Sequence, residues 1–291
     1  AASSRVTQIG KRRRPPRSLA LSMAGLALAL LAFAAGCESQ PELAPAPRAS
    51  REIPDVEEVR AHLMRSAQKW YSMEADCTVV IRSQSIRSSG NVDQLRRGKF
   101  YLEKTGDTPY SKVKLVAPEG ASPRVQLVGD GERYEMMVYG DRASGRYDAP
   151  LPQNVRIPLM PDDLADALDW PNLFMGRVQV PRVAYLPGTY CIDSLLPVEE
   201  PYPRLVASNT LFFPLGTMQP QIMRKYQPDG SLRSEARFGS IQMVKGPEDE
   251  TVNLPSQLFL LYPTAATVVR LTFTDIRLNT TLPADTFDVS Q

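Results

Sequence analysis

The sequence predicts a mainly β protein with two or more helices, in which about eleven strands form one strongly curved antiparallel sheet and the helices lie at its open side. Two observations favour this fold class. Short runs rich in β-branched and aromatic residues follow one another and are separated by turn residues. The few helical segments do not alternate with the strands as they do in parallel α/β folds. The sequence shows neither an internal repeat nor a boundary that would divide the body into two domains.

The first predicted element of the body is an amphipathic helix over residues 55–73. Its apolar positions recur at helical spacing, and they are Val56, Val59, Leu63, Ala67 and Trp70. Strand-forming runs follow at 77–81, 99–102, 112–116, 124–128 and 134–139. A short acidic helix is expected over 162–170. Further strands are expected at 204–213, 222–226, 232–244, 257–261 and 268–278, with Pro228, Asp229 and Gly230 as a hairpin turn.

Composition excludes several classes of protein. The chain has 291 residues, of which 43% are hydrophobic, so it has enough apolar material to build a core. Three cysteines are too few for a disulfide scaffold. Six of the 34 basic residues lie within the first 36 residues, which contain no acid, so the remainder carries 28 basic against 32 acidic residues. A slightly acidic body predicts no nucleic-acid partner.

The amino-terminal segment predicts export and lipid attachment. A basic run at 11–17 precedes an apolar stretch at 19–36, which ends in small residues directly before Cys37. This arrangement resembles a bacterial lipoprotein signal, in which the cysteine becomes the acylated first residue. A retained membrane anchor is the alternative, because the apolar stretch is just long enough to span a bilayer.

The predicted organisation therefore has three parts: a signal peptide over 1–36, a lipidated Cys37 with a proline-rich tether over 37–54, and one folded domain over 55–291. Glu38 follows the cysteine. By the enterobacterial sorting rule, a residue other than aspartate there permits delivery to the outer membrane. We therefore expect a lipid-anchored envelope protein, facing the periplasm at the outer membrane.

No complete catalytic or metal-binding motif occurs in the sequence: S-x-x-K at 66–69 and K-T-G at 104–106 lack the S-D-N element that accompanies them in penicillin-recognising enzymes. The sequence therefore predicts that the protein is not an enzyme and has no cofactor or metal. The acidic residues Asp162, Asp163, Asp166 and Asp169 fit either a cation site or the ordinary preference for acids near a helix N-terminus, and the second is favoured. Cys77 and Cys191 either pair as a disulfide or remain free thiols, since nothing in the sequence shows that they lie near each other.

The order of the motifs resembles the carrier and receptor family of the outer-membrane lipoprotein-localisation pathway (LolA/LolB-like) over about residues 55–289. These motifs are G-x-F-x-L at 98–102, a V-K-L strand at 113–115, a G-D-G turn at 129–131, the acidic helix, and a closing strand at 271–279 followed by Leu282, Pro283 and Phe287. The resemblance implies an incomplete, half-open barrel covered by helices, whose apolar concave face holds acyl chains. It also implies a periplasmic carrier protein as a partner, and a lipid-anchored member is similar to the receptor.

Two positions depart from the family pattern. Lys104 stands where the carrier has a functional arginine, so the positive charge is kept and the planar fork is lost. Glu119 falls where the receptor has a protruding leucine that helps to place cargo in the membrane. A carboxylate does not insert into lipid as leucine does, which favours a relative with altered cargo.

Alternating apolar residues on the first strands predict one apolar sheet face. The candidates for an acyl cavity are Phe100, Leu102, Lys104, Val113, Leu115, Val125, Leu127, Met136 and Val138. The same residues would serve an ordinary filled core beneath the helices. The sequence thus predicts a monomeric protein that binds acyl chains of lipoproteins or lipids and relays lipoproteins. A phospholipid or glycolipid binder and a non-transporting interaction module remain the alternatives.

Overall fold

The computed structural model describes residues 53–83, 94–105, 110–119, 122–147, 155–174, 177–184, 186–199 and 202–289. All of them belong to the second of two compact units, Ala49–Gln291. Cys37, the signal segment and the tether therefore lie outside the described residues, and their roles remain predictions.

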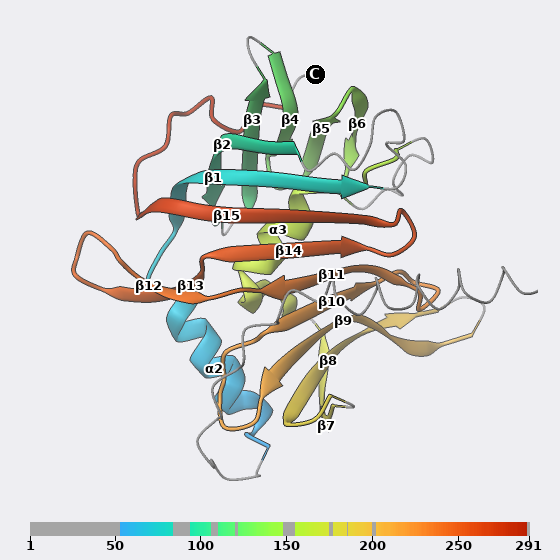
Figure 1. Ribbon diagram of the computed structural model, residues 1–291. Coiled ribbons are helices and arrows are strands. Elements are labelled where there is room, and N and C mark those ends of the chain that lie inside the picture. The colour runs from blue at the N-terminus through green and yellow to red at the C-terminus, as the bar shows by residue number, and fades with distance from the viewer. Residues whose placement is uncertain are drawn as a thin grey trace, which may run out of the picture. The chain divides into compact units, whose positions relative to one another are not determined.

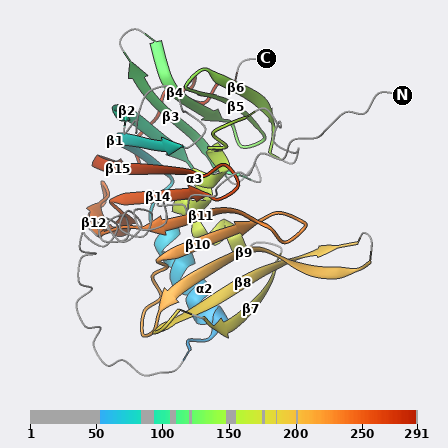
Figure 2. The same ribbon diagram turned by 45° about the vertical axis from the view of Figure 1, so that its right-hand side comes forward.

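One antiparallel sheet of thirteen strands dominates the described part of the chain, as Figures 1 and 2 show. In spatial order its strands are β6 (Asp141–Arg146), β5 (Arg133–Val138), β4 (Ser122–Gly129), β3 (Lys112–Glu119), β2 (Gln94–Glu103), β1 (Ser72–Ser83), β15 (Thr267–Leu278), β14 (Gln257–Tyr262), β11 (Leu232–Phe238), β10 (Ile222–Tyr226), β9 (Arg204–Pro214), β8 (Thr189–Val198) and β7 (Val178–Val183). The sheet does not close, so β6 and β7 are its edges. The predicted half-open barrel is confirmed, with more strands than expected.

The first and last strands meet in the middle of the sheet. β1 pairs with β2 on one side and with β15 on the other, so residues about two hundred positions apart lie in register, such as Val79 opposite Leu271. Because of this pairing, the two ends of the folded body hold its two halves together.

The first helix is shorter than predicted. α2 spans Val56–Ala67 and begins at Asp55, whose carboxylate accepts a hydrogen bond from the Glu57 amide at 2.8 Å. The helix stops at Ala67 because the chain must reach β1, whose first residues pair with the end of β2. Trp70 was predicted on the helix; it lies in the connection and is buried.

The second helix, α3, spans Pro161–Leu168 and leads through the 3₁₀ helix η1 (Trp170–Phe174) into β7. α3 contacts β3 and β4, and it lies behind β14 and β15 in Figure 1. Nearly every residue of α3 is buried, its acidic residues included. A short helix buried on all sides occupies the concave side of the sheet and does not lie on the surface.

Two parts of the strand prediction need correction. The predicted strand 232–244 is two strands, β11 and β12 (Ile241–Lys245), and β12 pairs only with β13 (Thr251–Pro255) in a separate hairpin. The proline-rich stretch 171–203, over which the sequence predicted no strand, contains η1, β7 and β8. β7 accommodates Pro181 because it is an edge strand, where a missing amide donor leaves no gap in the ladder.

Among the residues described, no helix is long and apolar enough to cross a membrane.

Candidate functional site

The predicted apolar residues lie on one face of the sheet. In the register of the strands, Phe100 stands opposite Leu115, Leu115 opposite Leu127, and Leu127 opposite Met136. Leu102 pairs in the same way with Val113, and Val125 with Val138. The alternation of the sequence therefore identified the apolar face and its strands correctly, and the structure adds which residues stand opposite one another.

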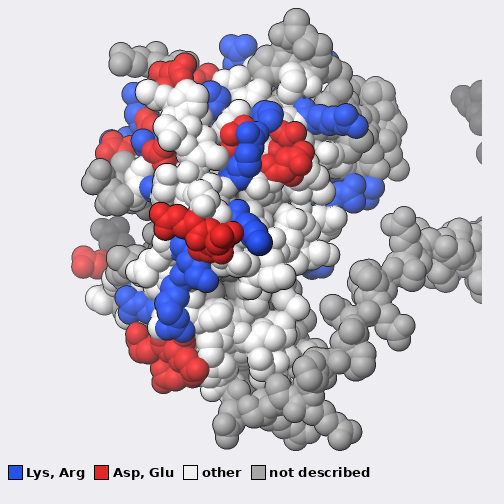
Figure 3. All heavy atoms as spheres, turned by 90° about the vertical axis from the view of Figure 1, so that its left-hand side faces the viewer, with Lys and Arg blue, Asp and Glu red and all other residues white. Residues whose placement is uncertain are grey.

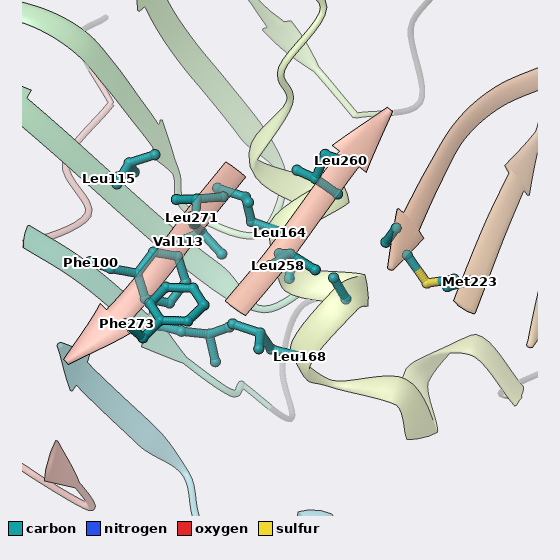
Figure 4. Packing of buried hydrophobic residues seen from close by; sticks show 14 of the residues in the cluster. Phe100, Val113, Leu115, Leu164, Leu168, Met223, Leu258, Leu260, Leu271 and Phe273 are labelled. Atoms are coloured by element: carbon teal, nitrogen blue, oxygen red, sulfur yellow. The ribbon is translucent and has the colours of Figure 1, made fainter. Parts of the chain in front are cut away.

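This apolar face is packed in the structure. The eight apolar candidates are at most 1% exposed, and they belong to one core cluster with Leu164 and Leu168 of α3. Figure 4 shows Leu164 and Leu168 beside Phe100, Val113 and Phe273, and the Phe100 and Phe273 ring centroids are 5.2 Å apart. Of the two sequence alternatives, the structure has the filled core, and α3 fills it. Their role as ligand-binding residues remains a proposal.

Lys104 lies at the edge of this core, at the end of β2. Its Nζ atom lies 3.4 Å from the centroid of the Trp70 ring, donates to the Ala67 carbonyl at 3.0 Å, and lies 3.4 Å from Asp169 Oδ1. Burial lowers the pKa of Lys104 to about 8, although Asp169 acts in the opposite direction. One ammonium group thus connects the end of α2 to Asp169, the residue that caps the end of α3.

The first turns of α3 carry three carboxylates, and all three contact cations of the sheet. Lys225 of β10 lies 2.7 Å from Asp162, 3.2 Å from Asp163 and 2.8 Å from Asp166. Arg233 of β11 lies 3.1 Å from Asp162 and 3.4 Å from Asp163. We call these five residues the α3 cluster. It holds three acids against two cations in an almost dry site, so its charges are not balanced when every group is ionised.

Hydrogen bonds complete the fixation of α3. The Tyr262 hydroxyl of β14 donates to Asp163 Oδ2 at 2.9 Å, and the Ser234 hydroxyl lies 3.4 Å from Asp163 Oδ1. At the other end of the helix, the Ser111 hydroxyl donates to Asp169 Oδ2 at 2.9 Å. Side chains therefore hold the helix at both ends: those of β10, β11 and β14 at its first turns, and those of Ser111, just before β3, and Lys104, just after β2, at its other end.

The charge imbalance moves the pKa values of the cluster in opposite directions. Burial raises the pKa of Asp162, but Lys225 and Arg233 outweigh burial and hold it at about 2. Burial raises the pKa of Asp166, and the neighbouring Asp162 adds to the rise while Lys225 opposes it. Asp166 therefore takes up a proton more readily than Asp162.

The carboxylates of α3 contact Lys225 and Arg233, cations of the protein itself. Within the described ranges, no group of three or more histidine, cysteine, aspartate or glutamate side chains is arranged to hold a metal ion. The sequence analysis missed Lys225, Arg233 and Tyr262 as partners of the acids. A signal existed at Lys225, since it stands two residues after the buried Met223 on the same strand and therefore points into the core.

The remaining candidates lie elsewhere. Cys77 on β1 and Cys191 on β8 are free, buried thiols, and five strands separate β1 from β8. The disulfide alternative is therefore wrong, because neighbouring strands are about 4.8 Å apart and disulfide Cα atoms are no more than about 7 Å apart. Glu119 is the last residue of β3, and its side chain lies outside the described part.

No protein-family model and no curated protein sequence matches the chain. Solved structures do. An outer-membrane lipoprotein-sorting protein domain from Vibrio parahaemolyticus is 9% identical, with a TM-score of 0.51 over 79% of this chain and 95% of that chain. A LolA superfamily protein from Nitrosomonas europaea is 13% identical, with a TM-score of 0.52 over 81% of this chain and 99% of that chain. The described domain therefore has the LolA/LolB-like fold that the order of its sequence motifs indicates.

Proposed function

We propose that this protein is a lipid-anchored envelope lipoprotein, attached through Cys37, that binds acyl chains on the concave face of its half-open barrel and receives or relays lipoproteins at the outer membrane. The observation that carries the proposal is the position of α3. This short helix fills the apolar face of a LolA/LolB-like sheet, and its ends are held by side chains instead of by strand pairing.

Binding requires that an acyl chain replaces α3 against the sheet. The helix presents Leu164, Ala165 and Leu168 to the core, and a saturated chain offers the same kind of contact. Each buried methylene contributes about 0.8 kcal/mol, so a chain of about 14 carbons contributes about 11 kcal/mol before ordering is counted. That magnitude is sufficient to offset the undocking of one short helix.

Lys104 is the residue that we assign to control of this exchange. It touches the end of α2 and the cap of α3 at once, and it stands where the family resemblance places a functional arginine. Movement of α3 breaks the contact of Lys104 with Asp169 and leaves the Lys104 ammonium group against the Trp70 ring.

A second candidate is a non-transporting interaction or regulatory module on the same fold. The packing of Phe100, Leu115 and Leu127, none of which is exposed, favours it, since a filled core has no need of a ligand. A phospholipid or glycolipid binder would differ from a lipoprotein carrier only in the headgroup that it accepts.

The deciding experiment is native mass spectrometry with lipid extraction on residues 39–291, produced in a bacterial periplasm and mixed with acylated or non-acylated lipoprotein. We expect binding of the acylated form alone. Phe100→Glu should abolish it by placing a charge on the apolar face, whereas Phe100→Leu, as the matched control, should retain it. If neither lipid nor acylated lipoprotein binds the wild-type protein, the transport proposal fails and the interaction module is favoured.

A further inference from the structure

The opposite face of the sheet contains a groove of about 950 Å³ where β1, β2, β3 and β15 lie side by side. Its lining comes from residues that alternate with the core, such as Lys99 and Tyr101 on either side of Phe100. The groove is therefore separated from the apolar face by the thickness of the sheet.

The C-terminal segment builds one wall of this groove. After β15 the chain passes over the outer face, and Pro283, Asp285 and Thr286 line the groove. The segment is fixed at both ends. Asn279 donates to the Lys69 carbonyl at 3.1 Å and accepts from the Tyr71 amide at 2.8 Å, while Phe287 is buried, with Lys112 Nζ 5.9 Å from its ring centroid. The wall is thus a built feature of the fold.

Two cations in the groove form no ion pair with the residues that the structure describes. Lys99 is hydrogen-bonded to Asp76, which raises the pKa of Lys99, so this pair is already neutralised. Arg97 on β2 and Lys114 on β3 also line the groove, and neither forms an ion pair with any residue that the structure describes. These two side chains supply an uncompensated positive charge on the β2 and β3 side.

Two carboxylates line the β15 side of the groove. Asp275 of β15 and Asp285 of the C-terminal wall line the groove, and within the described ranges neither contacts a cation. Asp275 has φ +49°, a left-handed backbone conformation within a strand that interrupts the regular alternation of β15. Figure 3 shows the side of the molecule on which β15 ends, where acidic and basic residues are interleaved without a large area of one sign.

We propose that this groove binds a phosphate–ammonium zwitterion of the phosphoethanolamine type. The phosphate contacts Arg97 and Lys114, and the ammonium group contacts Asp275 and Asp285. β2 and β15 are separated by β1, hence by about 10 Å, and side chains reaching inward from both leave room for a group whose two charges are a few ångströms apart. Hydroxyls of Thr78, Tyr101 and Thr274 line the space between them.

A zwitterion fits this lining better than an ion of one sign. A simple phosphate would meet Asp275 and Asp285 without compensation, and a simple amine would meet Arg97 and Lys114 in the same way. The proposal goes beyond acyl-chain binding and does not depend on it, because the groove and the apolar face lie on opposite sides of the sheet.

The test is isothermal titration calorimetry of the full chain in a non-ionic detergent with phosphoethanolamine, inorganic phosphate, ethanolamine and glycerol 3-phosphate. We expect saturable binding of phosphoethanolamine at least tenfold tighter than that of the three other compounds. Lys114→Gln and Asp275→Asn should each weaken it roughly tenfold, the effect of losing one charge-assisted contact. Lys245→Gln, a change of an exposed lysine on β12, should leave it unchanged.

The source of the zwitterion is resolved by flotation with vesicles. If the protein is retained more strongly on phosphatidylethanolamine than on phosphatidylglycerol vesicles, and Lys114→Gln reduces this retention, the ligand is a lipid headgroup. If phosphoethanolamine binds in calorimetry but the vesicles do not retain the protein, the ligand is a free zwitterion. Both outcomes support the proposal. Three outcomes would overturn the proposal: phosphate and phosphoethanolamine bind equally, no compound binds saturably, or both groove variants bind as the wild type does while their thermal unfolding also matches that of the wild type. These outcomes do not bear on the acyl-chain experiment.

Discussion

Replacing Lys225 by methionine tests how α3 is held. Lys225 Nζ contacts three carboxylates, and two of them, Asp162 and Asp163, keep Arg233 as a partner in the variant. Asp166 loses its cation, which lies at 2.8 Å. Methionine fills a similar volume, so the change removes the charge and leaves the packing largely intact.

The loss of unfolding free energy in Lys225→Met follows from the protonation of Asp166. A buried carboxylate without a cation takes up a proton instead of remaining ionised. At pH 7, protonating a carboxyl group with an ordinary pKa of 3.8 costs at most about 4 kcal/mol, at 1.36 kcal/mol per pH unit. We therefore expect the free energy of unfolding to fall by at most about 4 kcal/mol at pH 7 and by at most about 2 kcal/mol at pH 5.

Urea unfolding, followed by tryptophan fluorescence, measures this directly. The chain has two tryptophans, Trp70 beside Lys104 and Trp170 in η1, so both report on the surroundings of α3. Lys245→Met on the exposed side of β12 is the matched control and should change little. The double variant Lys225→Met with Asp166→Leu should recover most of the loss, since it removes the orphaned carboxyl group. A loss that is the same at pH 5 and pH 7, or that the second substitution does not recover, would refute the reasoning.

Two further predictions concern the cluster and the sheet. Because the pKa of Asp162 is lowered to about 2, its ionised carboxylate stabilises the folded protein above the ordinary pKa of 3.8, and this stabilisation is lost as the pH falls through 2. The difference in the free energy of unfolding between wild type and Asp162→Asn should therefore shrink by about 2 kcal/mol between pH 4 and pH 2. A difference that does not change with pH would contradict this. Gly98→Ala should destabilise the protein by about 1 to 3 kcal/mol in thermal unfolding, because a Cβ atom there would overlap the Val116 carbonyl oxygen, and an unchanged melting temperature would show that β3 can move aside.

Local sequence pattern predicted the sheet well because the same alternation decides both conformation and burial. Phe100 and Leu102, or Val125 and Leu127, stand at every second position, and each is buried on the common face. The glycine of the G-x-F-x-L motif also has a physical reason, since β3 crosses too close to Gly98 for any larger residue.

Two of the missed strands, β6 and β7, lack that local signal. β6 has the sequence Asp-Arg-Ala-Ser-Gly-Arg, which has little strand preference, and it forms because β5 offers an unpaired edge. β7 contains a proline that argues against a strand until its position at the edge is known. In both strands the tertiary position outweighs the intrinsic preference of the residues.

The α3 cluster was out of reach for a different reason. Asp162 and Lys225 are 63 residues apart, and their pairing depends on the folding of α3 onto β10. Acids in the first turn of a helix are common on protein surfaces, so the sequence around Asp162 and Asp163 gave no reason to expect burial. Only the inward position of Lys225 marked a charge that needed a partner within the core.

The composition of α3 bears on the opening that the proposed acyl-chain exchange requires. Replacing a buried ion cluster by apolar residues of similar size is often neutral or stabilising, so three carboxylates add little net stability to the docked helix. They do change the undocked state, because Asp162, Asp163 and Asp166 regain water when α3 leaves the sheet, and an apolar helix would instead expose its surface. The charged first turns thus lower the free energy of the open state relative to that of an apolar helix in the same place. In the proposed exchange, an acyl chain that replaces Leu164 and Leu168 against the sheet then has a smaller free-energy difference to overcome.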